Sequence, residues 1–129
     1  MDIVSALFCE NINLRQVPGP ATRIDLSGIM FSLPAPSEPP VTITPHLVVL
    51  VRCRPDEPGN AILEVLFKDE AGEEVARNAS PFTVEPGKFT YRLVRAELTY
   101  ETTGTIEAHC RVDRGPFTVV PLTLLPPVE

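Results

Sequence analysis

Carboxylate side chains gather in one stretch of this sequence, and they are the first candidates for chemistry. Six of them surround two predicted loops between residues 55 and 74: Asp56, Glu57, Asp69, Glu70, Glu73 and Glu74. Several oxygen ligands meeting at one point are what Ca²⁺ requires. The intervening segment 61–68 alternates like a strand, and at about 3.3 Å per residue it would hold the two acidic loops roughly 26 Å apart. The sequence therefore predicts no shared metal ion, and no cofactor is expected.

The second group of carboxylates has the pattern of a hairpin turn. The residues Asp69-Glu70-Ala71-Gly72 join two alternating segments, and Gly72 supplies the positive φ angle that a short bulged loop requires. An aspartate at the start of such a turn can accept hydrogen bonds from the backbone of the bend. We expect a solvated acidic turn here.

The remaining nucleophiles, bases and metal ligands form no catalytic pattern, so no catalytic residue is assigned. His109 and Cys110 are neighbours, but adjacent residues of a strand point to opposite faces. His46 has no acidic or cysteine neighbour at ligand spacing, and two histidines with three scattered cysteines make no zinc pattern. The sequence also lacks a glycine-rich phosphate loop and the G-x-S-x-G and H-E-x-x-H motifs.

Short strands must position these groups, because fifteen prolines cut the chain into pieces too short for long helices. Between the prolines, apolar residues alternate with polar ones, which is the period of a half-buried strand. The clearest case is 105–112, where Ile106, Ala108, Cys110 and Val112 share one face. Strands are predicted at 3–9, 23–31, 47–54, 61–68, 74–77, 88–100, 105–112 and 117–125.

Two segments depart from simple alternation. In 88–100, Phe89, Tyr91 and Leu93 are in phase and Val94 then begins a new phase, which predicts a bulge near Leu93–Val94. Segment 33–45 carries five prolines, so we expect a stiff, extended connection between sheets or a covered edge. A P-x-x-P ligand for a partner domain is the alternative reading of that segment.

About eight short strands separated by turn signals predict an all-β fold. The specific expectation is an antiparallel β-sandwich of about 7–9 strands with immunoglobulin-like Greek-key connections. Residues 1–129 suffice for a single domain and leave no room for two ordinary ones. Pro121 places the last strand at a sheet edge, because proline cannot donate to a central ladder.

Charged side chains line the outer face of the strand predicted at 105–112. Glu107, His109 and Arg111 alternate with its apolar residues and are expected beside Arg92 or Arg95 of a neighbouring strand. Cross-strand charge pairs contribute about 0.2–1 kcal/mol, so sheet stabilisation explains them adequately. A binding face made of Arg92, Glu107, His109 and Arg111 is the functional alternative.

The net charge of -6 at pH 7 disfavours nucleic acid and anionic membrane surfaces as partners. The N-terminus has an acid at Asp2 and only a short apolar run, with no basic region before it, so an export signal is not expected. The longest apolar stretch, Leu47–Val51, is too short to span a bilayer. These features predict a cytoplasmic protein.

Several segments resemble known domains. The hairpin "LFKDEAGEEVA" (66–76) and the ending "TYETTGTIEAHCRVDRGPFTVVPLTLLP" (99–126) resemble immunoglobulin-like sandwiches. With "SALFCENI" (5–12) and "DLSGIMF" (25–31), nearly the whole chain is similar to small uncharacterised bacterial domains of this type. The resemblance implies the fold and no activity. Antibody-type domains are not matched, because no Trp follows Cys53 and Ala108 stands where the tyrosine corner requires Tyr.

Cys9, Cys53 and Cys110 make an odd number, so at least one thiol is free. In a reducing compartment all three are expected to be reduced. A buried, reduced cysteine behaves as a small hydrophobe. The immunoglobulin resemblance implies an alternative, a bridge between Cys53 and Cys110 across two sheets. The sequence leaves both readings open.

These observations favour a non-enzymatic domain that binds or assembles with a protein partner. An exposed edge at Arg23–Phe31 or Phe117–Leu125 could pair with a second copy or capture a peptide strand. The alternative is a small-ligand or enzymatic sandwich with a pocket near Tyr91, Tyr100, His109 and Arg111.

Overall fold

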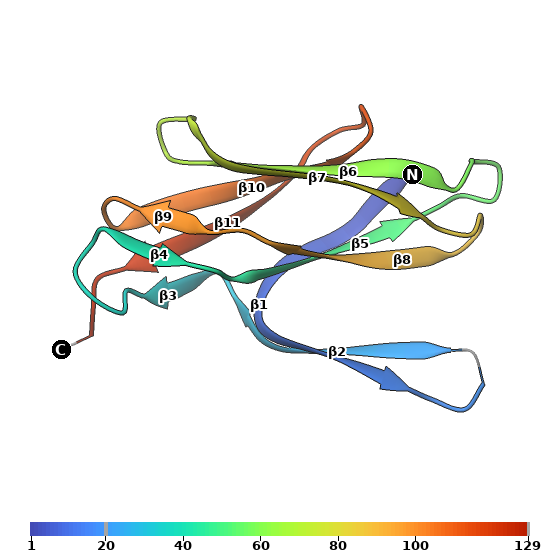
Figure 1. Ribbon diagram of the computed structural model, residues 1–129, viewed down its shortest axis with the longest axis horizontal. Helices are drawn as coiled ribbons and strands as arrows, with labels where there is room; N and C mark the ends of the chain where they lie inside the picture. The colour runs from blue at the N-terminus through green and yellow to red at the C-terminus, as the bar shows by residue number, and fades with distance from the viewer. Residues whose placement is uncertain (20, 129) are drawn as a thin grey trace.

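The computed structural model describes residues 1–19 and 21–128, and over those residues the chain forms strands and no helix (Figure 1). The all-β prediction is therefore confirmed. The described part of the chain accordingly offers no apolar helix of membrane-crossing length. Its strands are β1 (Asp2–Gln16), β2 (Thr22–Met30), β3 (Ser32–Pro34), β4 (Val41–Ile43), β5 (His46–Arg52), β6 (Asn60–Lys68), β7 (Glu74–Thr83), β8 (Phe89–Arg95), β9 (Leu98–Tyr100), β10 (Gly104–Val112) and β11 (Thr118–Leu125).

Hydrogen bonds join these strands into three sheets. The four-stranded sheet has the order β2-β1-β5-β8, the five-stranded sheet has the order β3-β11-β10-β6-β7, and β4 pairs with β9. Antiparallel pairing is confirmed with one exception, because β3 runs parallel to β11. The strands outnumber the prediction because β3, β4 and β9, each three residues long, carry too short a pattern to be recognised.

Alternation along the strands builds one hydrophobic core that both larger sheets share. The core includes Leu47, Val49 and Val51 from β5 and Leu63, Val65 and Phe67 from β6. The apolar face predicted for 105–112 is confirmed, since all four of its residues are buried in β10. Burying one such Val, Leu or Phe contributes about 1.5–3 kcal/mol. A slip of one residue would expose the whole set, so the pattern fixes the register.

Segment 88–100 was predicted as one bulged strand, and this is wrong. β8 ends at Arg95, and β9 begins at Leu98 in a different sheet. The ladder between β5 and β8 runs without a register shift. Phe89 and Leu93 are 67% and 45% exposed, whereas Val94 is buried. Phe89, Tyr91 and Leu93 therefore form the outward face of β8, whereas Thr90, Arg92 and Val94 lie opposite the core residues Val51, Val49 and Leu47 of β5.

The proline-rich segment 33–45 connects sheets, as predicted. It begins in β3 of the five-stranded sheet, passes through β4 of the two-stranded sheet and ends just before β5. The N–H of Ala35 donates to the carbonyl of Leu125 at 2.9 Å, which ties this segment to β11.

The edge predicted at β11 is present over only part of its length. β11 lies between β3 and β10, so it is not the outermost strand. Its pairing with β3 is confined to Thr123–Leu125, however, and Pro121 is paired only with Glu107 of β10 among the described residues. The missing N–H of Pro121 therefore coincides with the open side of the strand.

β1 and β2 form a hairpin that extends away from the body of the molecule (Figure 1). β1 pairs with β5 only from Asp2 to Cys9, and its remainder to Gln16 pairs with β2 alone. Gly28 lies opposite Glu10 with φ +68, and a Cβ at Gly28 would collide with the Glu10 side chain. Glycine adopts this left-handed conformation without steric cost, so Gly28 allows the hairpin to bend away.

Candidate functional site

The acidic turn at Asp69–Gly72 is structural, as predicted. Oδ1 of Asp69 accepts hydrogen bonds from the N–H groups of Ala71 at 3.0 Å and Glu73 at 2.9 Å. Gly72 has φ +82, the positive value that the turn requires. The carboxylate of Asp69 is therefore already occupied by the backbone of the bend.

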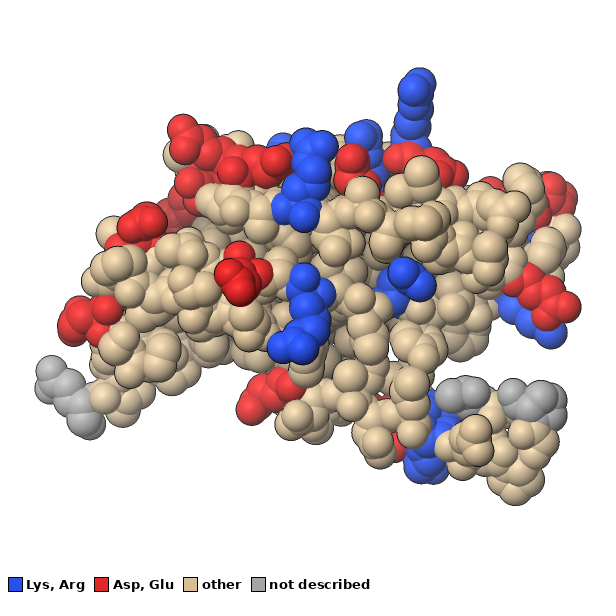
Figure 2. All heavy atoms as spheres, in the orientation of Figure 1, with Lys and Arg blue, Asp and Glu red and all other residues tan. Residues whose placement is uncertain are grey.

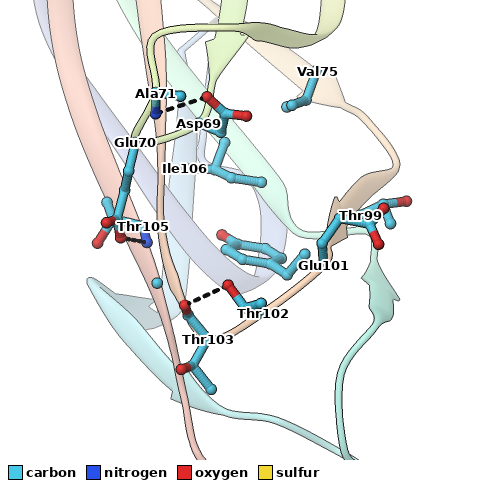
Figure 3. Close-up of a pocket in the computed structure, with 12 residues that line it drawn as sticks. Asp69, Glu70, Ala71, Val75, Thr99, Glu101, Thr102, Thr103, Thr105 and Ile106 are labelled. Atoms are coloured by element: carbon cyan, nitrogen blue, oxygen red, sulfur yellow. Dashed lines mark hydrogen bonds between the residues drawn. The ribbon is translucent and has the colours of Figure 1, made fainter.

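Glu70 makes a contact that the sequence did not indicate. Its Oε1 accepts a hydrogen bond from the N–H of Thr105 at 2.6 Å, which joins the turn to the start of β10 (Figure 3). Gly104 permits this approach, because a Cβ at that position would lie 2.5 Å from the same oxygen.

A cavity of about 440 Å³ lies beside this turn, walled by residues 69–71 and 99–106 (Figure 3). Asp69 and Glu70 are engaged with the backbone, as described above. Tyr100 donates its hydroxyl to the carbonyl of Leu122 at 2.7 Å, and burial raises the pKa of that hydroxyl. Asp69, Glu70 and Tyr100 thus each hydrogen-bond to the backbone at this cavity.

The two acidic loops do not meet. β6 separates them along Asn60–Lys68, as predicted from the alternation of 61–68. Among residues 1–19 and 21–128, no group of three or more His, Cys, Asp or Glu side chains is arranged to hold a metal ion.

The predicted charged face is present on β10 and is largely satisfied within its own sheet. Nη2 of Arg111 lies 2.7 Å from Oε1 of Glu64, and its guanidinium lies 4.7 Å from the centre of the Phe117 ring. The His109 ring packs edge-to-face on Phe117 with centroids 6.1 Å apart. Nε2 of His109 is 3.3 Å from Oε1 of Glu107, without hydrogen-bond geometry, and is buried with no hydrogen-bond partner among the described residues.

Arg92 does not join this face, and the expectation that it would is wrong. The neighbours of β10 are β6 and β11, whereas Arg92 and Arg95 belong to β8 in the other large sheet. Arg92 donates to Oγ of Ser80 at 3.3 Å and lies 5.9 Å from the centre of the Phe82 ring. Alternation assigns faces within a strand but does not say which strands are neighbours.

The four residues of the pocket expected under the alternative function also lie in different parts of the structure. Tyr100 is buried in the shared core, whereas His109 and Arg111 lie on the outward face of β10. Tyr91 lies on β8, in the other large sheet, opposite Leu50. The structure does not bring these side chains into one cavity.

The three cysteines are free and buried. Cys53 and Cys110 lie in the shared core, and burial raises the pKa of the Cys110 thiol to about 12. Cys9 pairs with His46 across the β1–β5 ladder, next to the core pair Phe8–Leu47, so it faces the other side of the sheet. Burial raises its pKa as well.

An open groove lies between the hairpin and β8. It has a volume of about 680 Å³ and is lined by Ala21 and Ile24 on one side and by residues 87–91 on the other. The space-filling view shows the hairpin separated from the body by a gap (Figure 2). A smaller hollow of about 200 Å³, lined by Val4, Leu50 and Arg52, shares the wall formed by residues 87–89.

Both strands that bound this groove are the outer strands of their sheet. β2 and β8 end the order β2-β1-β5-β8, so each has one side without a paired strand in the described part of the chain. The edge at Arg23–Phe31 was predicted, and β2 confirms it. The edge at β8 was missed, because its apolar face was assigned to the core.

Neither a scan against protein-family models nor a search of curated proteins finds a match to this chain.

Proposed function

We propose that this chain is a single, non-enzymatic β-sandwich domain that binds or assembles with a protein through a free edge of its four-stranded sheet. One observation carries the proposal: both outer strands of that sheet, β2 and β8, have an unpaired side and border one open groove. Membership of the small bacterial group that the sequence resembles, and a cytoplasmic location, belong to the same proposal.

The order of the strands supports an immunoglobulin-like Greek key. In such domains one sheet contains strands A, B and E, and the other contains C, F and G. The order β1-β5-β8 beside β6-β10-β11 fits this scheme, with connections crossing between the sheets after β5, after β7 and between β8 and β10. Cys53 directly follows β5 and Cys110 lies in β10, where antibody domains have their bridge.

The separation of reactive groups supports a non-enzymatic role. Catalysis by a nucleophile and a base requires the two within hydrogen-bond reach of each other. Cys110 is buried in the core, whereas its neighbour His109 lies on the outward face of the same strand. At the turn Asp69–Gly72, the carboxylates of Asp69 and Glu70 accept hydrogen bonds from backbone N–H groups.

Exposed strand edges recruit other chains because they present unpaired N–H and C=O groups. Two measurements test the proposal together: sedimentation velocity over a wide concentration range, and fluorescence anisotropy with labelled extended peptides of acidic, neutral and basic composition. We expect concentration-dependent association or saturable binding of at least one peptide. A strict monomer that binds none of the peptides would show the proposal to be wrong.

A further inference from the structure

The hairpin of β1 and β2 carries one apolar face along the part that extends from the body. In its ladder Ile12 pairs with Leu26, and Leu14 pairs with Ile24. Paired residues of a ladder point to the same face, and residues two apart along a strand share that face. Leu14 is 49% exposed, and a gap separates the hairpin from the body (Figure 2). A two-stranded hairpin is only marginally stable in water unless its apolar face packs against other structure.

The outward face of the four-stranded sheet is apolar at its centre. Two rows of cross-strand neighbours form this centre, which we call the sheet face: Leu7, Val48 and Leu93 in one row, and Ser5, Leu50 and Tyr91 in the next. The charged residues Arg52 and Arg95 stand in the rows on either side. An apolar centre with a polar rim is the usual composition of a protein–protein interface.

The hairpin and the sheet face border one open space without covering each other. Ala21 and Ile24 line one side of the groove of about 680 Å³, and residues 87–91 line the other. The adjoining hollow of about 200 Å³ extends this space to Val4 and Leu50. Val4 is 61% exposed there. Contiguous apolar surface that stays open to water marks an interaction site.

The surface area of the whole chain also points to a partner. The chain exposes 7797 Å². A compact monomer of 129 residues exposes about 6,700 Å², so the excess is about 1,000 Å². An interface of standard size buries about 800 Å² on each partner. The projecting hairpin is where this chain departs most from a compact shape (Figure 1), so one partner packed on the hairpin and the sheet face accounts for the excess.

A second copy fits these surfaces because one chain carries both an apolar arm and an apolar face beside it. In a two-fold dimer each copy lays its hairpin on the sheet face of the other, so one contact repeated by symmetry covers both surfaces. The six residues of the sheet face are uncharged, so the two-fold arrangement brings no like charges together at its centre.

We infer that two copies of this chain form a symmetric dimer in which the apolar face of each hairpin packs on the sheet face of the other copy. Side chains make this contact, whereas the proposed function concerns the unpaired strand edges. The inference therefore goes beyond the proposed function, and the two are tested separately.

Sedimentation velocity of the full chain over a wide concentration range measures the dimerisation. We expect a monomer–dimer equilibrium with a dissociation constant below about 100 μM and no larger species, because a two-fold contact closes on itself. A strict monomer at several hundred micromolar would overturn the inference. The labelled peptides would then still test the proposed function by themselves.

Two matched pairs of variants locate the contact. Leu14→Asp on the hairpin and Leu93→Asp on the sheet face should each weaken dimerisation at least about tenfold, because each buries a carboxylate. The controls are Ile62→Asp and Val119→Asp on the five-stranded sheet, where the original side chains are 50% and 45% exposed, against 49% and 45% for Leu14 and Leu93. Each control should change the dissociation constant less than about twofold. Association that Leu14→Asp and Leu93→Asp leave unchanged would overturn the inference and leave assembly through a strand edge in place.

Crosslinking tests the same contact without weakening the dimer. Leu14→Cys and Leu93→Cys are prepared as separate proteins, mixed and treated with a short bismaleimide. The wild-type chain is the control and should stay uncrosslinked, since Cys9, Cys53 and Cys110 are buried. The dimer that joins one chain of each variant should predominate over either self-linked dimer, because the hairpin of one copy meets the sheet face of the other. Self-linked dimers as the main product, or no crosslinked dimer, would contradict this arrangement.

Discussion

The outward faces of the two larger sheets differ in how far their polar groups are satisfied within the chain. On the five-stranded sheet, Arg111 pairs with Glu64 and packs on Phe117, and the turn residue Asp69 caps its own bend. On the four-stranded sheet, the apolar residues Phe89 and Leu93 are exposed; Arg15 pairs with Asp25 in the hairpin, whereas Arg52 and Arg95 make no ion pair within residues 1–19 and 21–128. The proposed function assigns the partner to the four-stranded sheet, because both of its outer strands have an unpaired side in the described chain.

Thiol accessibility gives the largest expected difference between the two sheets. Cys110 lies in the shared core, whereas Cys9 lies on the opposite side of the four-stranded sheet, beside the root of the hairpin. We expect Cys110 to be alkylated at least about 1,000-fold more slowly than in the unfolded chain, because it requires global unfolding. Local opening of the hairpin should expose Cys9 sooner.

Iodoacetamide labelling at pH 8, followed by mass spectrometry of peptides, measures both rates. Burial raises the pKa of Cys110 to about 12, so the folded state favours the neutral thiol. This contribution to stability is fully present below the unfolded pKa of about 8.5 and is lost as pH rises toward 12. Equal labelling of Cys9 and Cys110 would contradict the difference between the two sides.

The turn at Asp69 gives the next largest effect. Asp69→Ala removes an acceptor of two backbone hydrogen bonds and should lower the free energy of unfolding by about 1–2 kcal/mol. Urea denaturation measures the loss. Asp56→Ala is the control, because Asp56 is exposed on the other acidic loop, and its change should stay within about 0.5 kcal/mol.

Calcium distinguishes a structural turn from an ion site at the same position. Millimolar CaCl₂ should leave the melting temperature of the wild-type protein unchanged, since a ligand of the folded state would raise it. A large upward shift that Asp69→Ala abolishes would mean that the turn binds the ion.

The strands of the core could be predicted because burial imposes alternation on them. β10 has one apolar and one polar face, and every inward position of β6 is apolar, so their register follows from the sequence. β8 could not be assigned in this way, because its outward face carries the apolar residues Phe89, Tyr91 and Leu93, whereas the positions opposite the core residues of β5 include Thr90 and Arg92. The sequence signal for an exposed apolar surface was that Phe89, Tyr91 and Leu93 are out of phase with the core residue Val94.

The sequence alone did not indicate which distant strands pair with one another. The placement of Arg92 failed for this reason, since nothing in 88–100 indicates that β8 pairs with β5 and not with β10. The length of the hairpin was missed as well, although Asn11, Asn13 and Arg15 alternate with Ile12 and Leu14 as in a strand. Asn11, Asn13 and Arg15 are polar because the distal half of β1 leaves the body.

Substitution of Phe117 or Phe89 compares how much each outward face contributes to the free energy of unfolding. Phe117 is 41% exposed and contacts both Arg111 and His109, whereas Phe89 is 67% exposed. Phe117→Ala should lower the free energy of unfolding by about 1 kcal/mol through loss of the cation–π and aromatic contacts. Phe89→Ala should change it by less than about 0.5 kcal/mol. Urea titrations that rank the two variants in the reverse order would show that Phe89 is a core residue.

The smallest expected effect concerns the ion pairs of the two sheets. The side chains of Arg111 and Glu64 are 32% and 21% exposed, whereas those of Arg15 and Asp25 in the hairpin are 56% and 47% exposed. A double-mutant cycle with Arg111→Met and Glu64→Gln should give a coupling free energy of about 0.5–1 kcal/mol. The matched cycle with Arg15→Met and Asp25→Asn should give a smaller coupling that salt removes more completely, since water and ions screen an exposed pair.

Arg15 lowers the pKa of Asp25, so the contribution of the hairpin pair is present above the unfolded pKa of Asp25 and is lost as pH falls through its folded pKa. A coupling at the hairpin equal to that on β10 would show that the hairpin is as firmly held as the body, which would remove the contrast between the two faces.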